Sequence, residues 1–122
     1  MKTVNDDLLR EMTRRLAEQF QPEQIILFGS QVWGMPTSSS DIDVMVIVSE
    51  SNLSDYERSV LGHRCLSGLD TAKDVVVRTR AEFDFFRDAR ASLEYKIAHQ
   101  GKVLYDRRQS TTRAQLAHQG EA

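Results

Sequence analysis

Short, continuous apolar runs recur along this sequence, and they constrain its fold more than any other feature does. They cover residues 25–28 and most of residues 43–48 and 74–77. Runs of this length without polar alternation are typical of strands that are buried on both faces of a sheet. A last short strand is predicted over residues 102–105. The sequence therefore predicts several short strands, of which the first is buried.

Apolar residues at helical spacing predict a helix before the first of these strands. This helix is expected to begin after Asn5 or Asp6 and to end at Gln21-Pro22. Its apolar positions are Leu8, Leu9, Met12, Leu16 and Phe20.

Two more helices are expected between the later strands. One begins at Ser54 or Asp55, and its apolar face consists of Tyr56, Val60, Leu61, Leu66 and Leu69. The other covers much of residues 83–99 and stops at Gly101. Because helices and strands alternate along the chain, the predicted fold class is α/β (α+β).

Length and composition suit one small domain. The chain has 122 residues, of which 40% are hydrophobic and 28% charged, as in ordinary globular proteins. The domain is expected to span residues 1–105, and a polar tail covers residues 106–122. Cys65 is the only cysteine, so an intramolecular disulfide is excluded.

Charge and hydropathy argue against two classes of partner. The formal net charge is −2, which leaves no basic excess for tight, direct binding of nucleic acid. No stretch approaches the roughly 20 apolar residues that cross a bilayer, and the first residues lack the apolar segment of a signal peptide. A cytoplasmic protein without membrane contact is expected.

Gly29 and Ser30 directly follow the first predicted strand. A glycine at this point lets the backbone turn sharply and approach a ligand closely. If Ser30 opens a helix, its hydroxyl and the nearby N–H groups face an anion such as a triphosphate. The same dipeptide is also compatible with an ordinary turn.

Three aspartates stand at the starts of predicted strands. Asp41 and Asp43 are two residues apart, so their side chains point to the same face of a strand. Side by side they repel each other, and a magnesium ion that also binds substrate phosphates would offset this repulsion. Asp74 begins another strand and could join them. The alternative is that Asp41 and Asp43 lie at a solvated strand edge and that Asp74 is a strand-start residue in a turn.

Taken together, Gly29-Ser30, Gly34, the segment Ser40-Asp-Ile-Asp43 and the later Asp74 resemble the signature of the DNA polymerase β-like nucleotidyltransferase superfamily. The likeness is greatest to its minimal nucleotidyltransferase (MNT) domains and runs from the first helix to about residue 105. This resemblance implies a small mixed sheet backed by helices.

The resemblance also implies roles for these residues. Gly29, Ser30, Gly34 and Ser40 would bind the nucleotide, ATP. The catalytic and metal-binding residues would be Asp41, Asp43 and Asp74, with Mg²⁺ as the cofactor and Asp74 activating the acceptor hydroxyl. AMP would pass from ATP to that hydroxyl as pyrophosphate leaves.

One departure from the family pattern concerns the residues between the two glycines, which are often basic in the family. Here they are Gln31, Val32 and Trp33, so Lys73 or Arg78 would have to compensate, or affinity for nucleotide would fall. Trp33 is expected either to stack on a base or partner surface or simply to pack.

MNT domains typically act beside a HEPN-domain toxin, often as its antitoxin, and some of them place AMP on a tyrosine of the toxin. The resemblance implies the same role for this chain. A HEPN toxin is therefore the expected partner. Both a homo-oligomer and a hetero-oligomer are compatible with the sequence. Two alternatives remain: an antitoxin that only occludes its toxin, and a transferase that modifies a small molecule, like the aminoglycoside-modifying enzymes.

Overall fold

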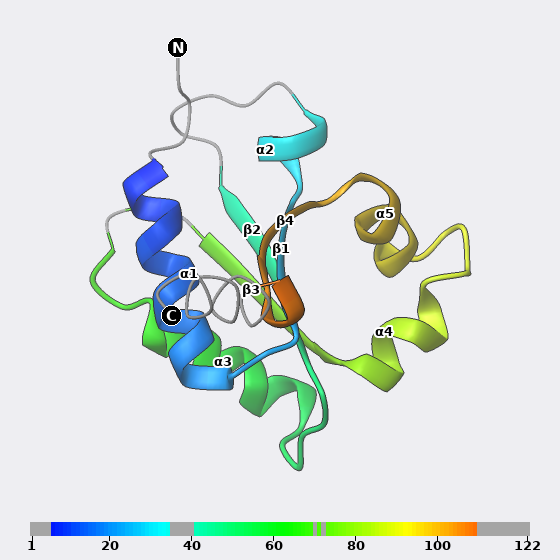
Figure 1. Ribbon diagram of the computed structural model, residues 1–122, viewed down its shortest axis with the longest axis horizontal. Helices are drawn as coiled ribbons and strands as arrows, with labels where there is room; N and C mark the ends of the chain where they lie inside the picture. The colour runs from blue at the N-terminus through cyan, green and yellow to red at the C-terminus, as the bar shows by residue number, and fades with distance from the viewer. Residues whose placement is uncertain (1–5, 35–40, 70, 72, 110–122) are drawn as a thin grey trace, which may run out of the picture.

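A computed structural model describes residues 6–34, 41–69, 71 and 73–109 of the chain (Figure 1). Its elements, in chain order, are α1 (Asp6–Phe20), β1 (Gln24–Phe28), α2 (Ser30–Trp33), β2 (Ile42–Val48), α3 (Asp55–Cys65), β3 (Lys73–Thr79), α4 (Arg80–Phe86), α5 (Leu93–Gln100) and β4 (Lys102–Asp106).

The four strands form one mixed sheet in the order β3-β2-β1-β4. β1 pairs antiparallel with both β2 and β4, whereas β2 and β3 are parallel. A parallel pair needs a long crossover connection, and α3 supplies it. The mixed sheet backed by helices agrees with the expected fold class.

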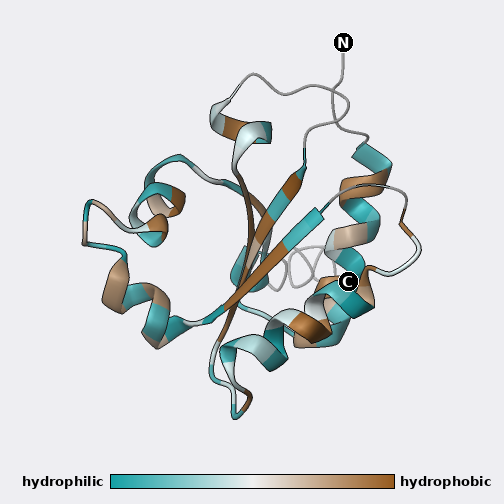
Figure 2. Cartoon of the chain, turned by 180° about the vertical axis from the view of Figure 1, so that it is seen from behind, coloured by the Kyte–Doolittle hydropathy of each residue, from teal (hydrophilic) through white to brown (hydrophobic). Residues whose placement is uncertain are grey.

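Helices cover both faces of the sheet, as the continuous apolar strands require. α1 and α3 lie on one side, and α4 and α5 lie on the other (Figure 1). Figure 2 shows the strands as the most continuously hydrophobic elements, whereas the helices mix hydrophobic and hydrophilic residues. The amphipathic helices therefore cover a sheet with two apolar faces.

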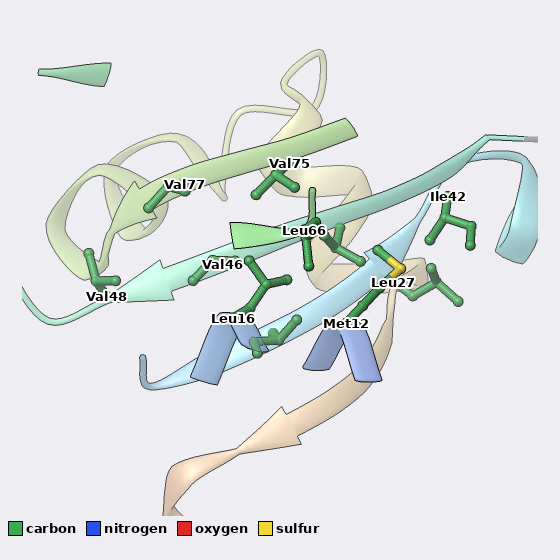
Figure 3. Close-up of a cluster of buried hydrophobic side chains, with 11 residues drawn as sticks. Met12, Leu16, Leu27, Ile42, Val46, Val48, Leu66, Val75 and Val77 are labelled. Atoms are coloured by element: carbon green, nitrogen blue, oxygen red, sulfur yellow. The ribbon is translucent and has the colours of Figure 1, made fainter. Parts of the chain in front are cut away.

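Alternate residues of β1, β2 and β3 belong to two separate core clusters. On the face of α1 and α3, Met12 and Leu16 point towards the sheet among residues such as Leu27 and Val46 (Figure 3). On the face of α4 and α5 the cluster contains Ile26, Phe28, Met45, Ile47, Phe83 and Ile97, with Trp33 and Val76 packed against it. This second cluster matters for function, because its residues continue towards Asp43.

The single helix expected over residues 83–99 is wrong, because two helices replace it. α4 ends at Phe86 and α5 begins only at Leu93. Ser92 fixes the break: its hydroxyl accepts a hydrogen bond from the Tyr95 amide and donates one to the Phe86 carbonyl oxygen. A serine cap of this kind satisfies the first amides of a new helix, so the chain restarts there.

Tyr56 also differs from its expected place. We expected it on the apolar face of the helix that follows Ser54, but its side chain is 78% exposed. Ser54 forms a capping box with Glu57, which places Tyr56 in the first turn, pointing outward. Ser40 and residues 110–122 lie outside the described residues. Among the described helices, none is long and apolar enough to cross a membrane.

Candidate active site

Gly29 forms the corner between β1 and α2, in a conformation that few other residues adopt. Its φ is +80°, in the region where a side chain is strained. Its carbonyl oxygen accepts hydrogen bonds from the amides of Val32 and Trp33, each 3.0 Å long. A Cβ atom on Gly29 would overlap a carboxylate oxygen of Asp43. Only glycine therefore lets this backbone lie against that carboxylate.

Asp43 and Asp74 are direct neighbours across the sheet. Asp43 is the register partner of Phe28 on β1 and of Asp74 on β3. Directly opposed residues of adjacent strands point to the same face, so both carboxylates lie on the face of α4 and α5, where Phe28 packs. Asp41 directly precedes β2 and, by the period of two, belongs to the same side. The structure thus brings the three predicted aspartates to one end of the sheet.

The electrostatics of Asp43 support this grouping. Partial burial raises the pKa of its carboxyl above the ordinary value, and the nearby charges of Asp74 and Asp41 raise it further. A carboxylate among other carboxylates favours its neutral form unless a cation offsets the charge. The site therefore has a physical demand for positive charge on the same face.

The donor set fits a cation that prefers oxygen and keeps some of its ligands outside the protein. No group of three or more His, Cys, Asp or Glu side chains within the described part of the chain is arranged to hold a metal on its own. Magnesium commonly binds one or two carboxylates and completes its shell with water and substrate phosphates. The Gly29 backbone lies directly against the Asp43 carboxylate, so a group bound at the glycine turn would also lie beside this carboxylate.

The remaining predicted nucleotide-binding residues lie in the same segment. Ser30 begins α2, and Gly34 follows its last residue. Gln31 of this helix donates a hydrogen bond of 3.3 Å from its side-chain nitrogen to the carbonyl oxygen of Asp41. The short helix is thereby tied to the start of β2, so the turn and the aspartates form one unit.

His63 belongs to the site, although the sequence did not identify it. Its Nε2 lies 3.4 Å from Oδ1 of Asp74, and its Nδ1 lies 2.8 Å from the carbonyl oxygen of Ser59, four residues earlier in α3. This second contact fixes the ring so that its other nitrogen faces Asp74. α3 covers the other face of the sheet, so this contact is made around β3, which is an edge strand, and helical spacing alone gives no sign of it.

The two basic residues proposed to compensate for the non-basic α2 do not reach the carboxylates. Arg78 pairs with Ile47 at the far end of β3, and its guanidinium forms ion pairs with Asp55 and Glu94. The ammonium of Lys73 donates to the carbonyl oxygens of Leu69 and Thr71. Both groups are thus held by local contacts, and the expectation that Arg78 compensates is wrong.

Trp33 packs against the second core cluster, as one of the two expected alternatives had it. Its ring centroid is 6.0 Å from that of Phe28. The Lys96 ammonium of α5 lies above the same ring, 4.3 Å from its centroid. Trp33 thus connects α2, which begins at the glycine turn, with α5.

A cavity of about 640 Å³ lies elsewhere on this face of the sheet. Its lining includes Glu23 and Gln24 at the start of β1 and Asp106 at the end of β4. The residues that line it do not include Gly29, Asp43 or Asp74. The carboxylate cluster is open instead, and the Asp74 side chain is 60% exposed.

A mixed sheet that presents a glycine turn and neighbouring aspartates at one end defines a nucleotidyltransferase-like fold and site. Comparison with known families agrees: the family described as "Polymerase beta, Nucleotidyltransferase" matches residues 10–110. Since the match covers most of the chain, this protein belongs to the polymerase β nucleotidyltransferase family.

One curated relative is the Methanocaldococcus jannaschii protein named "Putative protein adenylyltransferase". It is 36% identical over 58 residues, which are 46% of this chain and 58% of the relative. The match therefore spans little more than half of that protein's length.

Two solved structures share the fold. A nucleotidyltransferase, described as putative, from Sulfolobus solfataricus superposes with a TM-score of 0.60 at 20% identity, over 84% of this chain and 80% of that one. A chain from the crystal structure of the toxin–antitoxin MntA-HepT gives 0.56 at 21% identity, over 93% and 88%. These likenesses agree with the expected MNT-type fold.

Proposed function

We propose that this protein is a magnesium-dependent nucleotidyltransferase that moves AMP from ATP to a hydroxyl group, most simply a tyrosine of a partner protein. The observation that carries this proposal is the pairing of Asp43 with Asp74 across adjacent strands, where the Gly29 turn contacts the Asp43 carboxylate. That arrangement puts neighbouring carboxylates next to a glycine turn, as family membership leads one to expect.

In this proposal Gly29 and Ser30 hold the β- and γ-phosphates, and Gly34 and Ser40 also bind the nucleotide. Asp41 and Asp43 bind magnesium, which when present neutralises the phosphate oxygens. Asp74 completes the metal site and accepts the proton of the acceptor hydroxyl, whose oxygen attacks the α-phosphate in line. The α–β phosphoanhydride bond breaks and pyrophosphate leaves. The protein contributes mainly position and charge.

A HEPN-domain toxin is the proposed partner. Two observations support a protein acceptor: the relative named as an adenylyltransferase of proteins, and the shared fold with a chain of a toxin–antitoxin structure. The openness of the site adds a physical argument, because an exposed Asp74 needs a second surface to exclude water from the reaction. The acceptor protein would supply that surface.

The alternative function is that of an antitoxin which binds its toxin and blocks it by contact alone. The observation that favours it is the lack of basic residues among Gln31, Val32 and Trp33, where a triphosphate would profit from them. The two functions make opposite predictions for a variant that keeps the fold but loses a carboxylate.

The test is to co-express the helical partner toxin with either wild-type protein or Asp41→Asn. We expect the variant to bind the toxin, as measured by co-purification, but to lose protection of cell growth. Asp41 precedes β2 and is exposed, so its replacement disturbs little packing. Protection that survives in Asp41→Asn would instead favour occlusion. Asp88→Asn, an exposed carboxylate in the turn between α4 and α5, is the matched control and should protect fully.

A further inference from the structure

The proposed substrate brings more negative charge to a face that is already acidic. Asp43 and Asp74 are register partners on adjacent strands there, and Asp41 lies two residues before Asp43. A bound magnesium ion offsets part of this charge, but a triphosphate adds several negative charges of its own. The helix that follows Gly29 contains no basic residue. If the site binds a nucleotide, another element must supply a cation.

α5 supplies such a cation, Lys96, next to the helix that follows Gly29. The Lys96 ammonium is centred over the Trp33 ring at 4.3 Å, and Trp33 is the last residue of the helix that opens at the glycine turn. The amide of Trp33 donates directly to the carbonyl oxygen of Gly29. The Trp33 ring that the Lys96 ammonium contacts is therefore one helical turn away from the Gly29 backbone, which faces Asp43.

Lys96 and the aspartates also share one face of the sheet. Phe28 is the register partner of Asp43, so the two side chains point the same way. The Phe28 ring packs towards Trp33, and the Trp33 ring carries the ammonium. Phe28 and Trp33 thus connect Asp43 to Lys96 on one face of the sheet.

The charge of Lys96 is available, unlike that of its neighbours. Arg58, Arg78 and Arg80 are each engaged by carboxylates. The ammonium of Lys96, an exposed residue, makes no ion pair with the described residues and rests only on an aromatic ring. A cation–π contact made by an exposed ammonium is weaker than a charge-assisted hydrogen bond to a phosphate oxygen, so Lys96 can move to a phosphate.

We propose that Lys96, held in place by Trp33, binds the β- and γ-phosphates of the nucleoside triphosphate and takes the place of the basic residues that α2 lacks. This inference rests on the proposed function and adds a binding residue to it. Trp33 acts as a positioning residue, because its ring keeps a long, flexible side chain beside the turn.

Equilibrium dialysis with labelled ATP and magnesium tests this proposal in Lys96→Met. The variant keeps the length of the side chain but removes its charge, so we expect the Kd to rise about tenfold or more. Lys96→Arg should restore most of the affinity. AMP lacks the β- and γ-phosphates, so its affinity should be the same in wild type and Lys96→Met. A merely structural role would weaken both ligands alike.

Lys102→Met is the matched control. Lys102 is an exposed lysine that pairs with Leu27, so its side chain points to the opposite face of the sheet. This control should bind ATP with a Kd within about twofold of wild type, because distant surface charges are screened by salt.

The only tryptophan of the chain provides a second readout. ATP binding that draws Lys96 away from Trp33 should change the fluorescence of wild type and leave that of Lys96→Met unchanged. If wild type binds ATP with magnesium and Lys96→Met binds it equally well, the role of Lys96 is refuted while the proposed function stands. If wild type binds no nucleotide by dialysis, both proposals fail together.

Discussion

Replacing Asp43 with asparagine is expected to abolish nucleotidyl transfer and, at the same time, to make the folded protein more stable. The loss of transfer should be about a thousandfold, since a charged group that faces the reacting phosphates is removed. The gain in stability follows from the environment of Asp43, whose carboxyl is partly buried and lies among like charges. Catalytic residues commonly carry such a cost.

The sign of the stability effect follows from the direction of the pKa shift. The folded state raises the pKa of Asp43, so the folded protein binds a proton at this site more tightly than the unfolded chain does. Ionisation therefore costs stability, fully above the folded pKa and not at all below the unfolded value of about 3.8. Asparagine removes that cost at neutral pH.

Thermal unfolding without metal or nucleotide measures this effect. At pH 7 we expect Asp43→Asn to melt a few degrees above wild type, and this difference should shrink as the pH is lowered towards 4. Asp88→Asn is the surface control and should melt with wild type. An Asp43→Asn protein that melts below wild type at pH 7, or that still transfers AMP, would contradict this account of the site.

The second large effect is expected far from the active site, at Arg58. Its side chain is 6% exposed and forms an ion pair of 2.9 Å with Glu82. The guanidinium also donates to the carbonyl oxygens of Leu53 and Val77. It thus joins α3 to the end of β3 and the start of α4, where Glu82 also completes the capping box with Thr79.

Arg58→Met is expected to destabilise the fold by about 2–4 kcal/mol, because it removes the ion pair with Glu82 and the hydrogen bonds to the carbonyl oxygens of Leu53 and Val77. We give a value below that of a fully buried pair because Glu82 is 39% exposed and solvent screens it. Urea unfolding of the variant measures the loss. Arg64→Met, an exposed arginine on the same helix, should cost much less.

The pH dependence of the stability lost in Arg58→Met tests whether the ion pair with Glu82 causes the loss. Arg58 lowers the pKa of Glu82 to about 2 through hydrogen bonding. A lowered pKa stabilises the fold above the unfolded value of 4.5, and this contribution is lost as the pH falls towards 2. The gap in unfolding free energy between wild type and Arg58→Met should therefore narrow below pH 4.5. A gap that is constant from pH 7 to 3 would refute the role of the ion pair.

Much of the fold can be predicted from the sequence, because its signals are local. The strands are continuous apolar runs, and α1 ends where Gln21-Pro22 predicts. Membership of the polymerase β nucleotidyltransferase family was likewise predicted from residue order and spacing, and the family match confirms it. The break between α4 and α5 was missed, because residues 87–91 carry no glycine or proline and only the contacts of Ser92 define it.

The candidate site, like the fold, could be predicted only in part from the sequence. The aspartates and Gly29 were found because strand periodicity puts their chemistry in one place. Their roles in metal and nucleotide binding stay predictions. His63 and Lys96 were missed as partners, because each approaches its neighbour through the packing of a helix on the sheet. The expectation for Arg78 was wrong because Arg78 lies four residues from Asp74 along the strand, a distance of roughly 13 Å.

The central claim, transfer of a nucleotidyl group, is tested most directly by the fate of the label on ATP. The purified chain is mixed with its helical partner protein, magnesium and ATP that is labelled at either the α- or the γ-phosphate. The account predicts that α-label becomes attached to the partner protein and that γ-label appears only in pyrophosphate. Label from the γ-phosphate on the partner, or no label on a partner that forms a stable complex with this protein, would contradict it.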